Sequence, residues 1–500
     1  MNKKNYTSLK SGSDIRGTAI AAEAACVSLS DEAVYDLTAG FCTWLVENGY
    51  NKNKKIAVGH DSRITAERIK TAVFKALTFC GYEIYDCSYA STPAMFMSTV
   101  DMDFVASIQI TASHHPYDKN GLKFFTVNGG LDGSDISRII EIASESRPYS
   151  DDIADVVSCD YMSVYAERLR KMICDGVNAD NYSKPLDGYK IIVDAGNGVG
   201  GFYATEVLEP LGADITGSCF LEKDGMFPNH IPNPENKAAM ESVRNATISS
   251  KADLGVIFDT DVDRAGCVDC FGNEINRNRL VALASIIALE NNEGGTIVTD
   301  SVTSTGLTDF INNVLGGVHY RFRRGYKNVI NEQIRLNNEG INCPLAIETS
   351  GHAAFRENYY LDDGAYLVTK IIIKLAQLGK TGKNIDSLIE KLDEPVEEKE
   401  LRFRILETDF RSYGESVISD LEKYAAEKSD WRIADDNREG IRIYFDGENE
   451  KGWLLLRLSV HDPIMPLNIE SNVEGGVNRI ACRFKDFISG YSGLDIAPLM

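Results

Sequence analysis

The sequence predicts three similar α/β domains followed by a smaller α+β domain. At about 150 residues per domain, a chain of 500 residues has room for three or four of them. Apolar strand segments alternate with amphipathic helix segments from about residue 30, and this alternation recurs after residue 184 and again around residues 296–299. A charged segment at 393–399 then separates these units from a region of different character. We expect domains at residues 1–184, 185–292, 293–394 and 395–500.

The first domain shows α/β alternation from about residue 30 onward. Ser30 suits a helix start, apolar residues follow at intervals of three or four positions, and Gly49 closes the helix. Thr65 opens a second helix whose apolar positions also lie on one face. Strands are predicted at residues 55–58, 83–86 and 103–111.

The later units repeat this pattern. A strand at 190–194 precedes a Gly-rich turn and a helix that contains Tyr203 and Val207, and another strand is predicted at 296–299. The apolar stretch 280–289 is about half of the roughly 20 residues that a membrane-spanning helix needs, so we interpret it as a buried helix. The C-terminal region predicts a helix at 409–426 and strands at 440–445 and 453–458.

The overall charge argues against several classes of partner. Asp and Glu outnumber Lys and Arg by 74 to 52, so the net charge is −22, which disfavours nucleic acid and anionic membranes as partners. The amino terminus lacks the apolar segment of a signal peptide. Eleven scattered cysteines fit reduced thiols better than a disulfide framework. We therefore expect a cytoplasmic protein.

The first candidate site is the Thr-Ala-Ser-His-His-Pro segment at 111–116, directly after a predicted strand. A serine beyond a strand end, flanked by His114 and closed by Pro116, is positioned in a turn where its hydroxyl can be exposed and a base can reach it. Lys123 follows ten residues after Ser113. The alternative is an ordinary Ser-containing turn, since the Gly-x-Ser-x-Gly elbow of hydrolases is absent.

The second candidate site is a loop with three alternating carboxylates, Asp259, Asp261 and Asp263, after the predicted strand 254–258. Such carboxylates repel one another unless a divalent cation lies between them, and three protein oxygens leave room for the water and phosphate oxygens that Mg²⁺ prefers. A solvated acidic turn and a haloacid-type phosphatase loop are the alternatives. A calcium EF-hand fits poorly, because Arg264 and Cys270 stand where Gly and Glu are needed.

Two further segments carry groups suited to binding a phosphorylated sugar. Residues 348–352, Glu-Thr-Ser-Gly-His, combine groups that hold hydroxyls with a proton-transfer group. Residues 457–463 combine Arg, a hydroxyl and His in a loop suited to phosphate. Arg16, Arg63, Arg323 and Arg324 are further cations. With the segment 59–63 around Arg63 and the segment Phe-Pro-Asn-His at 227–230 included, only one of the seven histidines, His319, lies outside the segments that we single out.

Together these motifs resemble the α-D-phosphohexomutase superfamily, which includes phosphoglucomutase, phosphomannomutase and phosphoglucosamine mutase. The resemblance runs from Asp14 to about Glu470, with the phosphoserine, magnesium, sugar-binding and distal phosphate loops in the family's order. It implies four domains around a central cleft, one Mg²⁺, a phosphosugar substrate and a hexose 1,6-bisphosphate activator. A monomer or a homodimer is equally compatible with it.

The resemblance also implies residue roles. Ser113 carries the phosphoryl group and completes the Mg²⁺ site of Asp259, Asp261 and Asp263, while Lys123 with His352 or His114 exchanges the hydroxyl proton. Arg264 and Arg16 stabilise the charge that develops on the phosphoryl oxygens. The substrate is held by Glu348, Ser350, Gly325, Tyr326, Lys327, Arg457, Ser459 and His461.

The distal loop departs from the family's Arg-x-Ser-Gly-Thr-Glu-Pro pattern. Val460, His461 and Asp462 replace Gly, Thr and Glu, and Pro466 stands where Arg is usual. Substrate choice among glucose, mannose and glucosamine phosphates therefore stays open. An inactive phosphosugar-binding paralogue that acts as a sensor or scaffold is the alternative from another class.

A Gly-rich turn supports one more alternative, a dinucleotide oxidoreductase. Residues 196–201 match G-x-G-x-x-G after a predicted strand, and Glu222 follows about 20 residues later. A lone match of this kind is weak. A structural turn between strand and helix is the competing interpretation.

Overall fold

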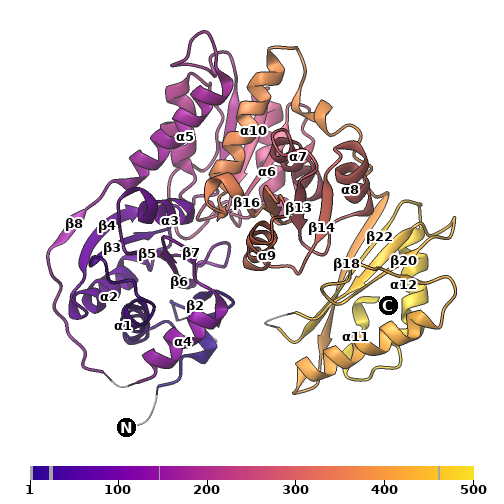
Figure 1. The fold of residues 1–500 in the computed structure, drawn as a ribbon, viewed down its shortest axis with the longest axis horizontal. Coiled ribbons are helices and arrows are strands. Elements are labelled where there is room, and N and C mark those ends of the chain that lie inside the picture. Colours follow the sequence, from indigo (N-terminus) through magenta and orange to yellow (C-terminus); the bar gives the residue numbers. More distant parts are fainter. Residues whose placement is uncertain (1–3, 22–25, 146, 460–461, 500) are drawn as a thin grey trace. The chain divides into compact units, whose positions relative to one another are not determined.

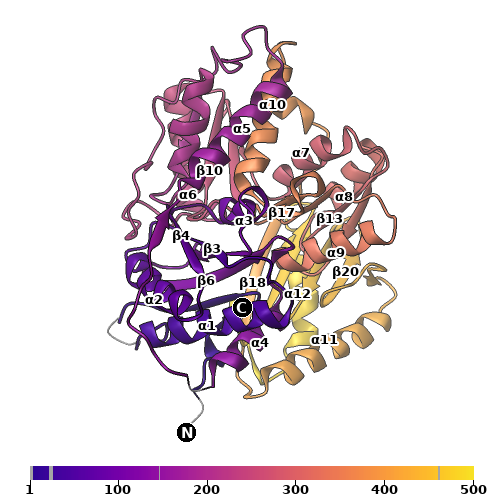
Figure 2. The same cartoon turned by 60° about the vertical axis from the view of Figure 1, so that its left-hand side comes forward.

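The computed structural model describes residues 4–21, 26–145, 147–459 and 462–499. The chain divides into two compact units, one comprising Met1–Ala288 and Ser350–Ile389, the other Leu289–Thr349 and Glu390–Met500. Figures 1 and 2 show their helices and strands. Val460 and His461, two of the altered distal-loop positions, lie outside the described residues.

The first unit begins with an eight-stranded sheet in the order β1-β2-β6-β5-β3-β4-β8, with β7 paired to β6. Helices α1 and α4 pack together with α2 over one face, and α3 packs on the strands from the other side (Figures 1 and 2). Helix α1 starts where predicted, since the Ser30 hydroxyl accepts from the Ala33 amide at 3.2 Å. The strands are Lys10–Ser11, Asp14–Thr18, Lys55–His60, Glu83–Tyr89, Ala106–Ile110, Lys119–Thr126, Gly129–Gly130 and Val156–Ser158, and the helices Asp31–Glu47, Ala66–Phe79, Thr92–Asp101 and Gly133–Ala143.

The second sheet of this unit has the order β12-β11-β10-β9, in which only β9 and β10 are parallel. Helix α6 packs on β9 and β10, while α5 and α10 pack against each other. The predicted helix around Tyr203 is a π-helix, Tyr203–Leu208. The other elements are α5 (Tyr161–Val177), β9 (Ile191–Asp194), α6 (Lys237–Ser250), β10 (Leu254–Phe258), β11 (Ala265–Asp269), β12 (Glu274–Ile275), α7 (Arg277–Leu289), β16 (Ala353–Phe355), β17 (Leu361–Asp362) and α10 (Gly364–Gly379).

The second unit contains three parallel strands in the order β14-β13-β15, against which α9 packs. Its other sheet is antiparallel, β19-β20-β21-β22-β18-β23, with α11 and α12 packed on it around one apolar core (Figure 1). The elements are β13 (Thr296–Thr299), α8 (Thr305–Asp309), β14 (Val318–Arg321), α9 (Tyr326–Asn338), β15 (Leu345–Ile347), β18 (Glu397–Ile405), α11 (Phe410–Ala426), β19 (Arg432–Ile433), β20 (Ile441–Phe445), β21 (Gly452–Leu456), β22 (Ile464–Ser471), α12 (Gly476–Ile488) and β23 (Leu494–Asp495).

The predicted separating segment 393–399 is partly a strand. Residues 397–399 begin β18, which pairs with β22 from Glu397↔Ser471 to Arg404↔Ile464. Its charged side chains point outward while Leu401, Phe403 and Ile405 enter the core, so the charge marks one face of a strand.

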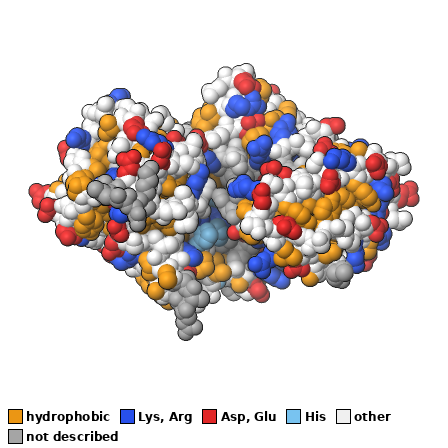
Figure 3. All heavy atoms as spheres, turned by 90° about the horizontal axis from the view of Figure 1, so that it is seen from below, with side chains coloured by type: hydrophobic (Ala, Val, Ile, Leu, Met, Phe, Trp, Pro, Cys, Tyr) orange, Lys and Arg blue, Asp and Glu red, His pale blue; other side chains and the backbone are white. Residues whose placement is uncertain are grey.

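On the face shown in Figure 3, acidic and basic side chains are interspersed with apolar ones. Among the described residues, no helix combines the length and the apolar character needed to cross a membrane.

Candidate active site

Ser113 lies in a loop that directly follows β5 and is held by its own neighbours. The Thr111 hydroxyl accepts from the Ser113 amide at 2.9 Å and donates to Asp61 at 2.7 Å. Ser113 is buried and adopts a left-handed backbone conformation, with φ 51°. A serine rarely takes this conformation without a local reason, and the hydrogen bond from its amide to Thr111 supplies one.

Arg63 holds the same loop in place through hydrogen bonds to its backbone. It is 2% exposed, and its Nε donates to the Asp61 carboxylate at 3.1 Å. The sequence singles out Arg63 as a cation without a role, because the groups that it binds lie about 50 residues further along the chain. Its guanidinium donates to four backbone carbonyls of the serine loop and its exit, those of Ser113, His115, Pro116 and Lys119.

The three carboxylates after β10 are buried and converge. Asp259, Asp261 and Asp263 place carboxylate oxygens within 4.8 Å of one another. Among the described residues, the Oδ1 atoms of Asp261 and Asp263 have no hydrogen-bond partner although they are buried. Buried carboxylate oxygens without donors are costly unless a cation binds them, and three oxygen ligands suit Mg²⁺. The donor set therefore fits the divalent cation expected there.

The serine loop and the carboxylate loop meet at the Ser113 hydroxyl. Its Oγ donates to Asp259 Oδ2 at 3.0 Å and accepts from Arg264 Nη2 at 3.1 Å. Arg264 Nε also donates to Asp259 at 3.2 Å. Burial and the neighbouring carboxylates raise the pKa of Asp259 well above its ordinary value. The structure thus brings a hydroxyl, a carboxylate and a guanidinium together at one point.

Lys123 and Thr92 complete the surroundings of the carboxylates. Lys123, on β6, places its ammonium 2.5 Å from Asp263 and 3.3 Å from Asp261. Burial acts to raise the pKa of Asp263, but Lys123, His352 and Arg264 together bring it below its ordinary value. The Thr92 hydroxyl donates to Asp261 at 2.5 Å. Thr92 carries no motif, so its role is visible only in the folded chain.

Two histidines lie at this site in opposite charge states. His114 Nδ1 is 3.2 Å from the Ser113 hydroxyl, and burial together with Arg264 lowers its pKa far below the ordinary value. His352 Nδ1 is 2.5 Å from Asp362 Oδ2. Burial alone lowers the pKa of His352, but Asp362 and Asp263 raise it to about 9. His114 is therefore neutral and His352 charged at neutral pH.

Arg16 and Ser350 also belong to the first unit. Arg16 pairs with Asp14 at 3.0 Å, and its buried Nε has no hydrogen-bond partner among the described residues. Arg16 acts electrostatically on His114 and on His115, so it lies near the serine loop. Ser350 is buried at the start of the segment that carries His352.

The remaining predicted substrate residues belong to the second unit. Glu348 follows β15, and its carboxylate accepts from the Gly325 amide at 2.5 Å, just before α9 begins with Tyr326 and Lys327. Arg457, after β21, is 9% exposed, and its Nε has no partner among the described residues. The Ser459 hydroxyl accepts from the Asp462 amide at 3.3 Å.

The Gly-rich turn at 196–201 is packed against the chain itself. A Cβ on Gly198 would lie 2.7 Å from the Thr260 carbonyl oxygen, and one on Gly201 would lie 2.4 Å from that of Leu221. The glycines thus allow close packing of the turn on neighbouring loops. This favours the structural interpretation over a dinucleotide site.

Comparison with known proteins matches three consecutive segments of the chain to one family. Residues 8–150, 163–272 and 276–394 match the alpha/beta/alpha domains I, II and III of phosphoglucomutase/phosphomannomutase, in that order. These ranges cover well over half of the chain.

Individual relatives match along nearly the whole chain. A phosphoglucomutase of Neisseria gonorrhoeae is 27% identical over 465 residues, which is 92% of this chain and 94% of that protein. A phosphomannomutase/phosphoglucomutase of Pseudomonas aeruginosa is 27% identical over 440 residues, 86% of each chain. A solved phosphoglucomutase/phosphomannomutase family protein from Burkholderia thailandensis has the same fold, with a TM-score of 0.78 at 23% identity over 97% of this chain and 98% of that one. The chain belongs to the phosphoglucomutase/phosphomannomutase family.

Proposed function

We propose that this protein interconverts hexose 1-phosphate and hexose 6-phosphate through phosphorylated Ser113 and a hexose 1,6-bisphosphate intermediate. Family membership makes it a mutase, an enzyme of the isomerase class. The observation that carries the detailed proposal is the meeting of the Ser113 hydroxyl with Asp259 and Arg264 at 3.0 and 3.1 Å. A serine in such surroundings is poised to carry a phosphoryl group rather than to stabilise a turn.

The chain's own residues account for the two transfer steps. Arg264 and Arg16 stabilise charge on the phosphoryl oxygens as the group passes between Ser113 and a sugar hydroxyl. Lys123 with His352 or His114 exchanges the hydroxyl proton: neutral His114 can accept it, and the charged Lys123 and His352 can donate one. Asp259, Asp261 and Asp263, together with phosphorylated Ser113, would hold one Mg²⁺, and the ion would supply Lewis-acid stabilisation of phosphoryl charge.

The substrate residues are proposed to hold the sugar and the phosphate that is not reacting. Glu348 and Ser350 bind sugar hydroxyls. Residues 325–327, at the start of α9, also contact the substrate. Arg457 and Ser459, with His461, hold the distal phosphate. This second cradle is needed because the bisphosphate must turn end for end between the two transfers.

The wider setting is part of the same proposal. The four domains span residues 1–184, 185–292, 293–394 and 395–500. The protein is cytoplasmic. A hexose 1,6-bisphosphate activates the enzyme by phosphorylating Ser113. The protein works as a monomer or as a homodimer.

The deciding experiment compares three substrates under identical conditions. Purified protein is assayed with glucose, mannose and glucosamine 1-phosphates, in the presence of Mg²⁺ and a trace of the matching 1,6-bisphosphate, and kcat/KM is measured for each. We expect turnover of at least one sugar, and loss of turnover in Ser113→Ala. Binding of all three sugars without turnover of any would replace the mutase by a phosphosugar-binding protein.

A further inference from the structure

A turn at the start of β20 places an acidic residue beside the proposed distal phosphate site. Ile441 pairs with Leu456, so the preceding residues Glu439 and Gly440 lie alongside Arg457. Gly440 has φ 58°, and a Cβ there would lie 2.8 Å from the Arg457 Cα. Only glycine permits this close approach, which brings Glu439 next to the arginine.

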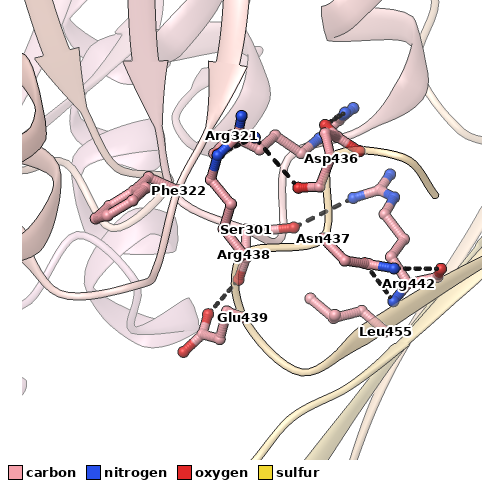
Figure 4. A pocket seen from close by; sticks show the side chains of 9 residues that line it. All are labelled: Ser301, Arg321, Phe322, Asp436, Asn437, Arg438, Glu439, Arg442 and Leu455. Carbon is pink, nitrogen blue, oxygen red and sulfur yellow. Dashed lines mark hydrogen bonds and ion pairs between the residues drawn. The ribbon is translucent and has the colours of Figure 1, made fainter. Parts of the chain in front are cut away.

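The Glu439 carboxylate already binds two donors from neighbouring loops. Its Oε2 accepts from the Ser301 hydroxyl at 2.5 Å and from the Arg324 amide at 3.1 Å. Ser301 follows β13 and Arg324 follows β14, so both donors stand at the carboxyl ends of parallel strands, where ligands of α/β sheets bind. Figure 4 shows Glu439 and Ser301 facing each other in a small pocket that Arg321 and Arg438 also line.

Arg457 is a buried cation with acidic neighbours. Burial lowers the pKa of Arg457, and Glu439 is the strongest of the charged groups that oppose this effect, ahead of Glu400 and Asp300. The Arg457 Nε has no hydrogen-bond partner among the described residues. A phosphate that arrives at Arg457 therefore meets an anion that is already there.

We propose that Glu439 determines how tightly the distal site holds phosphate, by opposing the substrate dianion and by occupying the donors of Ser301 and Arg324. The inference rests on the proposed function, in which Arg457 binds the distal phosphate. Like charges a few ångströms apart repel even in the partly hydrated surroundings of a binding loop. Weaker phosphate binding lets the bisphosphate dissociate from this loop and turn before the second transfer. Glu439 therefore lowers the affinity for phosphate and raises kcat.

The opposite role predicts the opposite result. If Glu439 served mainly to hold Ser301, Arg324 and Arg457 in place for phosphate, then removal of its charge would weaken binding. Glu439→Gln separates the two roles, because the amide oxygen still accepts one hydrogen bond while the negative charge is gone. Glu439→Asp retains the charge and serves as the conservative variant.

Phosphate affinity is the first measurement. Inorganic phosphate is titrated calorimetrically into the wild type and four variants: Glu439→Gln, Glu439→Asp, Arg457→Ala and, as a matched control for net charge, Glu448→Gln on an exposed turn of the same sheet. We expect Glu439→Gln to bind about 3- to 10-fold more tightly, with Glu439→Asp and Glu448→Gln near the wild type. Weaker or unchanged binding in Glu439→Gln would overturn the inference.

Steady-state kinetics is the second measurement, on the sugar phosphate that is turned over best. We expect KM and kcat to fall together in Glu439→Gln, with slower release of the bisphosphate, whereas a general loss of structure would lower kcat without lowering KM. Arg457→Ala separates this inference from its premise. If this variant binds phosphate like the wild type, the distal site lies elsewhere and the proposed substrate geometry fails. If Arg457→Ala loses binding while Glu439→Gln does not gain it, only the role of Glu439 is wrong.

Discussion

At the scale of single residues, the proposed active site depends on Ser113 having a conformation that the chain would otherwise avoid. A left-handed backbone costs a residue with a side chain roughly 1 kcal/mol or more. The contacts from Thr111 and Arg63 offset this cost and hold the loop from two sides. The same contacts fix the hydroxyl between Asp259 and Arg264.

The first prediction concerns the phosphoryl group itself. Intact-mass analysis of the purified enzyme should show a species heavier by one phosphate after incubation with hexose 1,6-bisphosphate, because Ser113 is the hydroxyl that meets Arg264 and the carboxylates. Ser113→Ala should lose this species and retain its fold by circular dichroism. Phosphate mapped by peptide sequencing to another residue would contradict the assignment.

The second prediction concerns the carboxylate loop. Asp261→Asn should lower the maximal rate by about 100-fold or more while leaving the melting temperature unchanged or higher, since it removes one of three mutually repelling buried charges. Excess chelator should abolish the activity of the wild type, and added Mg²⁺ should restore it.

A buried aspartate outside the cluster provides the control. Asp194 accepts hydrogen bonds from His230 and Ser242, so Asp194→Asn should cost stability with a smaller effect on rate. Full activity of the wild type in chelator would show that the cluster does not serve a metal.

At the scale of elements, the start of α10 links helix packing to the active site. Asp363 caps this helix by accepting from the Tyr366 amide at 2.9 Å, and it also accepts from the Tyr165 hydroxyl of α5 at 2.7 Å. The adjacent Asp362 holds His352. The pairing of α5 with α10 therefore fixes the position of a proposed proton-transfer group.

The third prediction tests this link. Tyr165→Phe leaves the buried Asp363 carboxylate without one of its donors, so we expect a loss of about 1–3 kcal/mol in the free energy of unfolding and a modest fall in kcat. Tyr161→Phe is the matched control on the same helix. Its partner Asp101 is exposed and can bind water instead, so the loss should be smaller and kcat unchanged. Equal effects in both variants would argue against the link.

At the scale of the whole molecule, the stability of the C-terminal sheet should depend on pH through Glu470. This residue is 6% exposed on β22, accepts from the Trp453 indole at 2.9 Å, and has its pKa raised by burial to about 7. Below the ordinary Glu value the carboxyl is protonated in both the folded and the unfolded chain. Between that value and about pH 7 only the folded chain holds the proton, so stability falls as pH rises.

The fourth prediction is the removal of this dependence in Glu470→Gln, which stays neutral at every pH. Relative to the variant, the wild type should lose up to about 3 kcal/mol between pH 4.5 and 7. The measurement is urea unfolding followed by tryptophan fluorescence, since Trp431 and Trp453 both lie in the C-terminal core or beside it. Glu448→Gln is the control. Parallel pH profiles for the wild type and Glu470→Gln would refute the assignment of the titrating group.

The sequence predicts a large part of this molecule because its elements are encoded locally. The strands 254–258 and 296–299 coincide with β10 and β13, and the helix start at Ser30 coincides with that of α1. These elements depend on apolar spacing and caps within about 20 residues. The sequence does not predict β18, because its charged face resembles a linker and its partner residues on β22 lie 60 or more positions away.

The sequence by itself determined the fold class and the chemistry-bearing segments, because strand ends, turn residues and clustered charges are local patterns. Ser113 and the three aspartates were visible in this way. Only the tertiary structure decided that Arg63 binds the serine loop, that Thr92 donates to Asp261, and that Glu439 lies beside Arg457. Each of these contacts joins residues that are distant in the chain. Their free energy comes from burial and hydrogen bonding between elements, which no single segment contains.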